Sequence, residues 1–264
     1  MIYVCIPSYN EGPTVGLLLW KIRQVFAGFP REYQLLVLDD GSTDATAEVL
    51  APYARVLPLT VLRHEQRRGY AASVEALLSK AVELTDRPKR DAAILIHADF
   101  KHNPQVIPDL VRRIESGADI VVAQGKLQGE PSQAYRLLRR LAPQLLRGVV
   151  AVPGVKDLVS GLAIIRLVAL RNAMRVQEGS LLVTDGWAAN AELYWRAGRY
   201  ARRVEAIPSI ERHDLRQRPT RVRPLETAME LWRARAKLRN SPIAPSSAEP
   251  APRHETERPA EAVS

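Results

Sequence analysis

Three short polar clusters carry the residue types from which a ligand-binding site could be built. They span residues 6–12 (IPSYNEG), 38–44 (LDDGSTD) and 96–104 (IHADFKHNP). Each follows a run of Val, Ile, Leu or Ala, which is typical of a buried strand. Turns at strand ends expose backbone N–H groups and polar side chains, so these clusters could bind a charged or hydroxylated ligand.

The second cluster places two acids, Asp39 and Asp40, next to each other. Adjacent carboxylates repel one another unless a metal, a base N–H or a ribose hydroxyl uses them. The alternative is an ordinary turn, in which Ser42 or Thr43 caps a helix that begins near Asp44.

The third cluster combines a histidine, an acid and a lysine. If the strand extends to its end, alternation puts His97 and Asp99 on the same side. A His and a carboxylate so placed could bind a divalent cation that bridges a diphosphate. Lys101, two residues further on, could neutralise the same phosphates directly.

The elements around these clusters alternate between strand and helix. Four strand–helix repeats of this kind predict an α/β fold, with a mostly parallel sheet covered by helices on both faces. The ligand crevice of such a sheet lies beyond the carboxyl ends of the strands, where the clusters fall. The expected strands are 2–8, 34–39, 59–64 and 92–98, and the expected helices are 13–27, 44–54, 69–84 and 104–116.

The alternation becomes less regular after an expected fifth strand at residues 120–124. Leucines interleaved with arginines predict a basic amphipathic helix over 133–147, which Pro143 should kink or end. This helix could lie at a membrane interface or face the core with solvated arginines. Further elements are expected as a strand at 159–165, a helix at 185–197, a strand at 200–208 and a charged helix at 224–239.

Composition places the chain among ordinary globular proteins, with 46% hydrophobic and 25% charged residues. We expect one catalytic domain over residues 1–240 and a disordered tail rich in Pro, Ala and Glu over 241–264. The single cysteine, Cys5, cannot form an intramolecular disulfide, and no apolar stretch reaches bilayer-spanning length. These features predict a cytoplasmic protein whose membrane contact, if it has one, is peripheral.

The net charge of +9 is concentrated in residues 199–240, which hold 12 Arg or Lys against five Asp or Glu. This block indicates an acidic partner such as nucleotide phosphates, a lipid phosphate or anionic headgroups. A nucleic-acid-binding module would explain the block but not acids at three strand ends. We therefore expect no nucleic-acid partner.

The order of the clusters resembles glycosyltransferase family 2. The series is PSYNE, DDGSTD, RRGYAA at residues 67–72 and HADFKHNP, and its spacing is most similar to the dolichol/polyprenol-phosphate mannosyltransferases. KDLVSG at 156–161 resembles the Asp-x-x-Ser-Gly segment of that family, and residues 185–193 and 203–208 resemble two later elements. The resemblance covers about residues 2–225.

This resemblance implies a GT-A fold, which is Rossmann-like, and an inverting hexosyltransferase. Such an enzyme moves a sugar from a GDP- or UDP-sugar to an acceptor, here a polyprenyl or other lipid phosphate. Pro7, Tyr9 and Glu11 would then line the nucleotide pocket, with Asp40 on the base or ribose. Asp99 would be catalytic, as the principal metal ligand.

Two departures from the family pattern affect the metal and the acceptor. His97 replaces the first acid of the Asp-x-Asp motif and Lys101 replaces a polar residue, so two oxygen ligands for Mg²⁺ or Mn²⁺ are lost. His97 could still bind Mn²⁺, and Lys101 could supply part of the charge. Where relatives carry Gly-Ser-Arg, this chain has AQGK at residues 123–126, and Lys126 could replace the arginine.

The remaining candidates concern the diphosphate and the acceptor. Arg67 either approaches the diphosphate or is solvated, while Lys126, Ser160, Arg218 and Arg221 are candidates for acceptor binding. An ionised phosphate acceptor needs no general base, whereas a sugar hydroxyl needs one, for which Asp185 is the candidate. Asp185 could instead be the N-cap of the helix that follows it.

Two other functions fit the same motifs. The chain could be a family 2 transferase that acts on a soluble hydroxyl acceptor, such as a natural product or an envelope precursor. The altered Asp-x-Asp motif also fits a nucleotide-sugar-binding protein without catalytic activity. Transfer of a labelled sugar onto a lipid separates these alternatives from the lipid-phosphate transferase.

Overall fold

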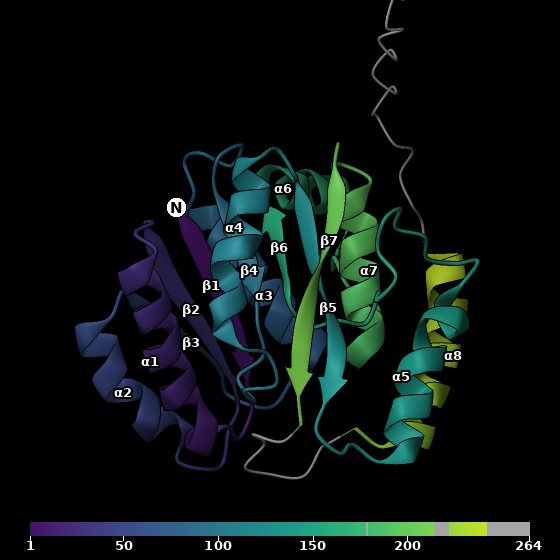
Figure 1. The fold of residues 1–264 in the computed structure, drawn as a ribbon, viewed down its shortest axis with the longest axis horizontal. Coiled ribbons are helices and arrows are strands. Elements are labelled where there is room, and N and C mark those ends of the chain that lie inside the picture. The colour runs from purple at the N-terminus through teal and green to yellow at the C-terminus, as the bar shows by residue number, and fades with distance from the viewer. Residues whose placement is uncertain (178, 214–221, 242–264) are drawn as a thin grey trace, which may run out of the picture.

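The protein forms a seven-stranded sheet with helices on both faces (Figure 1). The computed structural model describes residues 1–177, 179–213 and 222–241. Nearly all of the expected tail, from residue 242 onward, lies outside the described residues, as do Arg218 and Arg221. Within the described part of the chain, no helix combines the length and the hydrophobicity needed to cross a bilayer.

The first half of the chain alternates strand and helix, as expected. Runs of Val, Ile and Leu form parallel strands that are buried on both faces. β1 lies between β2 and β4 and pairs in parallel with both. The elements are β1 (Ile2–Ser8), α1 (Gly12–Gly28), β2 (Tyr33–Asp40), α2 (Thr46–Val56), β3 (Leu59–His64), α3 (Tyr70–Leu84), β4 (Ala92–Leu95), η1 (Pro104–Val106) and α4 (Ile107–Glu115).

The second half extends the sheet in the order β3-β2-β1-β4-β6-β5-β7. β6 is antiparallel to both of its neighbours, while β7 pairs in parallel with β5 along the whole length of that strand. The elements are β5 (Ile120–Gln128), α5 (Gln133–Leu146), β6 (Ala163–Arg166), α6 (Leu167–Val176), α7 (Gly186–Gly198), β7 (Val204–Arg212) and α8 (Pro224–Asn240).

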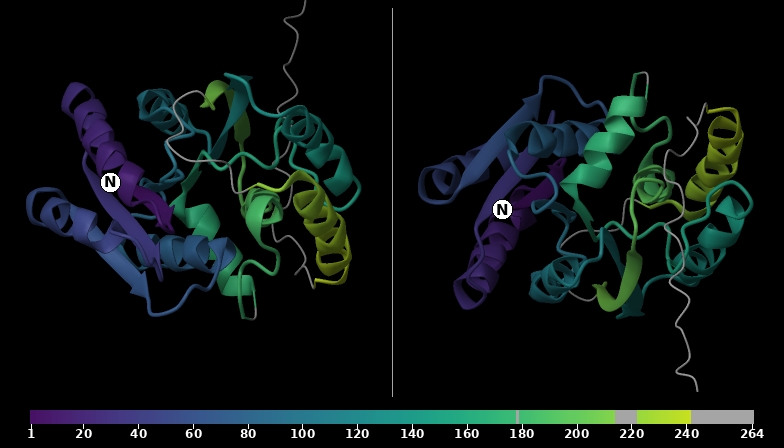
Figure 2. Two further views of the ribbon diagram at one scale, coloured as in Figure 1. Left: turned by 90° about the horizontal axis from the view of Figure 1, so that it is seen from below. Right: turned by 90° about the horizontal axis from the view of Figure 1, so that it is seen from above.

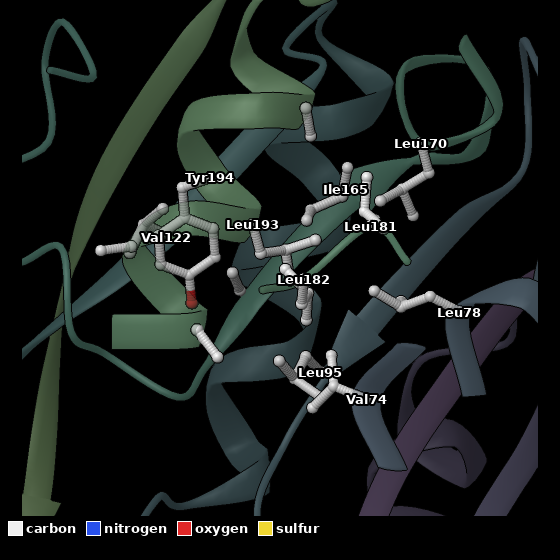
Figure 3. Close-up of a cluster of buried hydrophobic side chains, with 14 of the residues drawn as sticks. Val74, Leu78, Leu95, Val122, Ile165, Leu170, Leu181, Leu182, Leu193 and Tyr194 are labelled. Carbon is white, nitrogen blue, oxygen red and sulfur yellow. The ribbon is translucent and has the colours of Figure 1, made fainter. Parts of the chain in front are cut away.

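Two apolar cores hold the layers together, one on each face of the sheet. The first packs side chains of α1, α2 and α4 against β1, β2 and β4. The second packs α3, α5, α6, α7 and α8 against the other face (Figure 2). Figure 3 shows part of the second core, where Leu193 and Tyr194 of α7 meet Val122 of β5 and Ile165 of β6.

The structure corrects several expected boundaries. β4 ends at Leu95 instead of residue 98, so His97 and Asp99 lie in the loop after the strand and their placement does not follow from strand alternation. α5 continues through Pro143 to Leu146. α6 was not predicted, because its ten residues directly follow β6 and its apolar stripe reads as a continuation of that strand. Ser42 and Thr43 do not cap α2, since the Asp44 carboxylate accepts from Thr46 N–H at 3.0 Å.

A buried glutamate on α7 fixes the loop in front of that helix. Glu192 is fully buried, and its Oε2 accepts from Val183 N–H, Thr184 N–H and the Thr184 hydroxyl at 2.7–3.0 Å. Its Oε1 pairs with Arg196 Nε at 2.8 Å. One carboxylate therefore connects two turns of α7 to the segment that leads into Asp185.

We expect Glu192→Gln to lower the free energy of unfolding by about 3 to 5 kcal/mol, because it leaves the buried Arg196 guanidinium without its charge partner. Denaturant unfolding measures this loss. Glu83→Gln is the matched control, because Glu83 forms an exposed ion pair with Lys80 and such pairs contribute about 0 to 1 kcal/mol. Equal losses in the two variants would contradict the role given to Glu192.

Candidate active site

One cavity of about 240 Å³ opens where the carboxyl ends of β1, β2 and β4 meet. The chain runs from β1 outward to β2 and β3, then returns to β4 on the other side of β1, so the cavity lies at the switch point of the sheet. It is lined by Pro7, Ser8, Tyr9, Glu11, Asp40, Arg67, Tyr70, Ser73, His97, Ala98, Asp99, Lys101, Val159, Gly161, Trp187, Asn190 and Val222. All residues predicted to bind the nucleotide sugar are in this set.

The loops after β1 and β2 are cross-linked by hydrogen bonds. Asn10 N–H donates to Ser42 Oγ at 2.9 Å, and Asn10 Oδ1 accepts from Thr43 N–H at 2.8 Å. Glu11 N–H donates to Thr46 Oγ1 at 3.0 Å. These bonds fix the two loops relative to each other before any ligand binds.

Asp40 shapes the loop in front of α3. Its Oδ1 accepts from Arg68 N–H at 2.8 Å and lies 2.7 Å from His64 Nδ1, while its Oδ2 accepts from Gly69 N–H at 2.9 Å. Gly41 has a φ of 66°, and a Cβ there would lie 2.7 Å from Arg67 N. The close approach of the two loops therefore requires glycine at this position.

The two adjacent acids use different partners. Asp39 Oδ1 accepts from Ser42 N–H at 3.0 Å, and its Oδ2 lies 3.5 Å from Arg63 Nε. Because successive residues of a strand point to opposite sides, the carboxylates of Asp39 and Asp40 do not share a site. Both Asp40 oxygens and Asp39 Oδ1 accept hydrogen bonds from the protein, whereas the buried Asp39 Oδ2 has the ion pair with Arg63 but no hydrogen bond with any residue that the structure describes.

Arg67 stacks on an aromatic side chain of the pocket. Its guanidinium carbon lies 4.3 Å from the centre of the Tyr9 ring. Such a cation–π contact holds the long side chain against the pocket wall. Arg67 lines the cavity and is also exposed, so its approach to the diphosphate stays a prediction.

His97 is sandwiched between an aromatic ring and a glycine. Its ring stacks on Tyr70, with centroids 4.9 Å apart and planes inclined by 10°. A Cβ built on Gly161 would lie 2.0 Å from His97 Nε2, so this edge of the imidazole faces the Gly161 backbone. Burial raises the pKa of Tyr70, which keeps its proton and donates to Asn190 Oδ1 at 2.7 Å.

A tight turn after His97 brings Asp99 and Lys101 to the same pocket wall. Phe100 adopts a φ of 59°, which is uncommon for a residue other than glycine. Lys101 N–H donates to Asp99 Oδ1 at 3.2 Å, and Arg212 N–H donates to the carbonyl of Lys101 at 2.8 Å. The turn is therefore fastened to β7.

A buried carboxylate behind this turn, Glu211 of β7, was not predicted from the sequence. Its Oε1 lies 2.7 Å from Lys101 Nζ and accepts from the Tyr135 hydroxyl at 2.6 Å, while its Oε2 accepts from Arg139 Nη2 at 2.9 Å. Burial alone would raise the pKa of Glu211, but Lys101, His213 and Arg139 hold that pKa well below its usual range.

The residues around Asp99 do not match the donor set of a divalent cation. Mg²⁺ and Mn²⁺ favour carboxylate, carbonyl and water oxygens. Beside Asp99, Lys101 offers an ammonium, and the Nε2 edge of His97 faces backbone. Among the described residues, no group of three or more His, Cys, Asp or Glu could hold a metal ion. The predicted His97–Asp99 pair therefore does not form a complete metal site by itself, and its role as a metal ligand stays a prediction.

Three other predicted residues lie outside this lining. Asp185 Oδ1 accepts from Gly186 N–H and from Ala71 N–H, each at 2.8 Å, so it caps α7 and also the first turn of α3. Ser160 is buried and donates to the carbonyl of Ala123 at 2.6 Å. Lys126 is exposed on β5. Their catalytic and acceptor roles remain predictions.

A doubly wound α/β sheet with a polar, partly cationic crevice at its switch point defines a nucleotide-binding class of protein. Comparison with known proteins specifies the class further. Residues 3–173 match the sequence profile of Glycosyl transferase family 2. The chain belongs to this family.

Two relatives act on lipid phosphates according to their names. The chain is 28% identical over 209 residues to a dolichol-phosphate mannosyltransferase of Pyrococcus furiosus, a match that covers 77% of this chain and 54% of that protein. It is 31% identical over 149 residues to an undecaprenyl-phosphate 4-deoxy-4-formamido-L-arabinose transferase of Photorhabdus laumondii, over 56% and 43% of the two chains. The chain spans about half the length of the curated relatives it matches.

Solved structures confirm the GT-A fold. A mannosyltransferase from Pyrobaculum calidifontis in complex with GDP-Man and Mn²⁺ superposes with a TM-score of 0.58 at 20% identity, over 92% of this chain and 65% of that one. Glucosyl-3-phosphoglycerate synthase from Mycobacterium tuberculosis, with Mn²⁺, UDP-glucose and glycerol 3-phosphate, gives 0.59 at 20% identity over 92% and 82%.

We expect Gly161→Ala to displace His97 from its stack on Tyr70, because the new methyl group would lie 2.0 Å from His97 Nε2. Overpacking of this kind costs about 1 to 3 kcal/mol in the free energy of unfolding. Thermal unfolding measures that cost, and calorimetric titration with UDP or GDP should show weaker binding. Gly28→Ala is the matched control, because a Cβ at Gly28 meets nothing within 4 Å. A fully stable Gly161→Ala variant with unchanged affinity would contradict this packing.

Proposed function

We propose that this chain transfers a sugar from a nucleoside-diphosphate donor to a polyprenyl or other lipid phosphate, with inversion at the anomeric carbon. The observation that carries the proposal is the convergence of Glu11, Asp40 and Asp99 on one cavity beside Arg67 and Lys101. These residues come from loops that are far apart in the sequence. A cavity with both acids and cations suits a ligand that combines hydroxyl groups with a diphosphate.

The order of residues in the cavity suggests how the donor lies. Tyr9 and Arg67 form an aromatic and cationic wall for the nucleoside, next to the loop that Asp40 shapes. Lys101 and Trp187 form a second part of the lining, here called the second wall, with Lys101 Nζ 5.8 Å from the centre of the Trp187 ring. We assign the diphosphate and the sugar to this second wall, where the Asp99 carboxylate can accept hydrogen bonds from sugar hydroxyls.

A phosphate acceptor makes a general base unnecessary. Its oxygen is already ionised near pH 7 and attacks the anomeric carbon from the face opposite the nucleoside diphosphate. The only large charge that develops is on the departing diphosphate, so the pocket must stabilise an anion and need not remove a proton. Asp185 can therefore serve as the cap that the structure shows.

The names of the relatives support a lipid acceptor, and so does one surface of the protein. α5 and α8 lie side by side (Figure 1 and Figure 2). α8 buries Leu231, Ala234 and Leu238 against the core. Its opposite stripe exposes Leu225, Met229 and Trp232 by 82%, 51% and 63%.

An exposed apolar stripe with arginines beside it is typical of a helix that lies at a membrane interface. Arg233 and Arg235 follow Trp232 on α8, and Leu137 of α5 is also 58% exposed. We propose that this surface rests on an anionic bilayer, which would hold a lipid-phosphate acceptor near the pocket. The peripheral membrane contact thus belongs to the same proposal.

The direct test is transfer of labelled sugar from UDP-glucose or GDP-mannose to undecaprenyl phosphate, after thermal unfolding identifies the nucleotide that stabilises the protein. We expect Asp99→Asn to lower kcat on the order of 100-fold, because the carboxylate that accepts hydrogen bonds from the sugar hydroxyls and positions the donor is lost. Asp109→Asn is the matched control, since Asp109 is exposed on α4 and pairs with Arg112. Nucleotide binding without transfer to any lipid would identify a binding protein and refute the proposal.

The membrane surface has its own test, which is sedimentation with phosphatidylglycerol vesicles. We expect Met229→Glu combined with Trp232→Glu to reduce vesicle binding at least about tenfold, because two exposed apolar side chains no longer enter the interface. Trp20→Glu is the control, as Trp20 is exposed on α1. Equal vesicle binding by the double variant and the wild-type protein would exclude α8 as the contact surface.

A further inference from the structure

Lys101, the cation closest to Asp99 in the sequence, forms an ion pair with the buried carboxylate of Glu211. Lys101 Nζ lies 2.7 Å from Glu211 Oε1. The Glu211 side chain is 0% exposed, whereas the Lys101 side chain is 13% exposed and lines the cavity. Lys101 is therefore the member of the pair that reaches the cavity lining, and the Glu211 carboxylate lies behind it.

The position of this ammonium is fixed from several directions. The backbone of Lys101 is held by Asp99 Oδ1 on one side and by Arg212 N–H on the other. Its ammonium lies 5.7 Å from the centre of the Tyr135 ring and 5.8 Å from that of Trp187. A lysine held in this way needs little reorganisation when negative charge develops beside it, which is the condition for efficient electrostatic stabilisation.

Arg139, the second cation that contacts Glu211, is also bound by the carboxylate of Asp157. Arg139 donates to both oxygens of Asp157, at 2.5 and 2.7 Å, and also to Glu211. Its planar guanidinium is thus occupied by two carboxylates, and burial leaves it 8% exposed. Arg139 compensates the charge of Asp157 and shares that of Glu211. Of Lys101, Arg139 and these two acids, Lys101 is the residue that lines the cavity.

The same wall is poorly suited to a divalent ion. An ammonium repels a metal cation at short range, and the Nε2 edge of His97 faces Gly161. The ammonium has three N–H donors, so its bond to Glu211 leaves others for phosphate oxygens. Part of the charge that a metal would bring to the diphosphate is thus available from the chain itself.

We propose that Lys101, held by Glu211, stabilises the departing diphosphate, and that sugar transfer by this chain needs no divalent cation. The inference rests on the proposed function. The electron pair of the bond between the anomeric carbon and the diphosphate oxygen moves to that oxygen, while an oxygen of the acceptor phosphate forms the new bond. Lys101 stays protonated and donates hydrogen bonds to the leaving diphosphate throughout the step.

The first experiment uses the wild-type full chain. Sugar transfer to undecaprenyl phosphate is measured after dialysis against EDTA, in EDTA, and after addition of Mn²⁺ or Mg²⁺. We expect the same kcat within about twofold in all three conditions. Loss of activity in EDTA with recovery in Mn²⁺ would overturn the role of Lys101 and leave the proposed function intact, whereas absence of transfer under every condition would refute the proposed function itself.

The second experiment removes the positive charge of Lys101. Lys101→Met should lower kcat in EDTA on the order of 100-fold, the loss typical of one anion-stabilising donor. Lys101→Arg, which keeps the charge, should retain more activity than Lys101→Met. Lys80→Met is the matched control, because Lys80 also forms an ion pair but lies on the outer surface of α3. A Lys101→Met variant as active as Lys80→Met would overturn the inference.

Binding provides a readout that does not depend on turnover. Calorimetry in EDTA with UDP and UMP, or GDP and GMP, should show that the wild-type protein favours the diphosphate and that Lys101→Met loses this preference. Undiminished preference in Lys101→Met would count against the inference. If Lys101→Met does not fold, because Glu211 has lost one of its charge partners, Lys101→Arg and the EDTA experiment on the wild-type chain still decide the question.

Discussion

The parallel pairing of β1 with both β2 and β4 is the constraint on which the site depends. It aligns the carboxyl ends of three strands at one edge of the sheet, so the loops after Ser8, Asp40 and Leu95 must meet. The chain leaves β1 toward β2 and β3 on one side and returns to β4 on the other side. The connections therefore diverge at β1 and leave room between them. The cavity occupies this position, and its lining comes from segments that are distant in the sequence.

Buried carboxylates then fix the loops that the strands bring together. Asp40 holds the turn before α3, Glu192 holds the turn before α7, and Glu211 holds the turn that carries Lys101. Each accepts several hydrogen bonds or ion pairs, which offsets the cost of burying its charge. These three acids therefore act as internal supports for the loops around the cavity.

The sequence predicted the parallel half of the fold and most of the pocket because these features follow from local patterns. Buried strands read as runs of Val, Ile and Leu, and the clusters at their ends were identified by their order. Glu211 and the packing of His97 on Gly161 could not be predicted, since both depend on contacts between distant segments. α6 was missed because it follows β6 without an intervening turn. The role of Asp185 was ambiguous because a helix N-cap and a general base can both be an aspartate.

The charge balance explains why the third cluster could depart from the family pattern without loss of its site. A carboxylate in place of His97 would add negative charge beside Asp99 and would favour a metal ion to compensate it. With an imidazole ring at His97 and an ammonium at Lys101, the same wall carries fewer carboxylates and has its own cation. Glu211 is then required behind the wall, because a cation enclosed by Tyr135 and Trp187 would otherwise lack a counter-charge. His97, Lys101 and Glu211 thus form one electrostatic arrangement, in which the charges of Lys101 and Glu211 balance each other and His97 adds no second carboxylate beside Asp99.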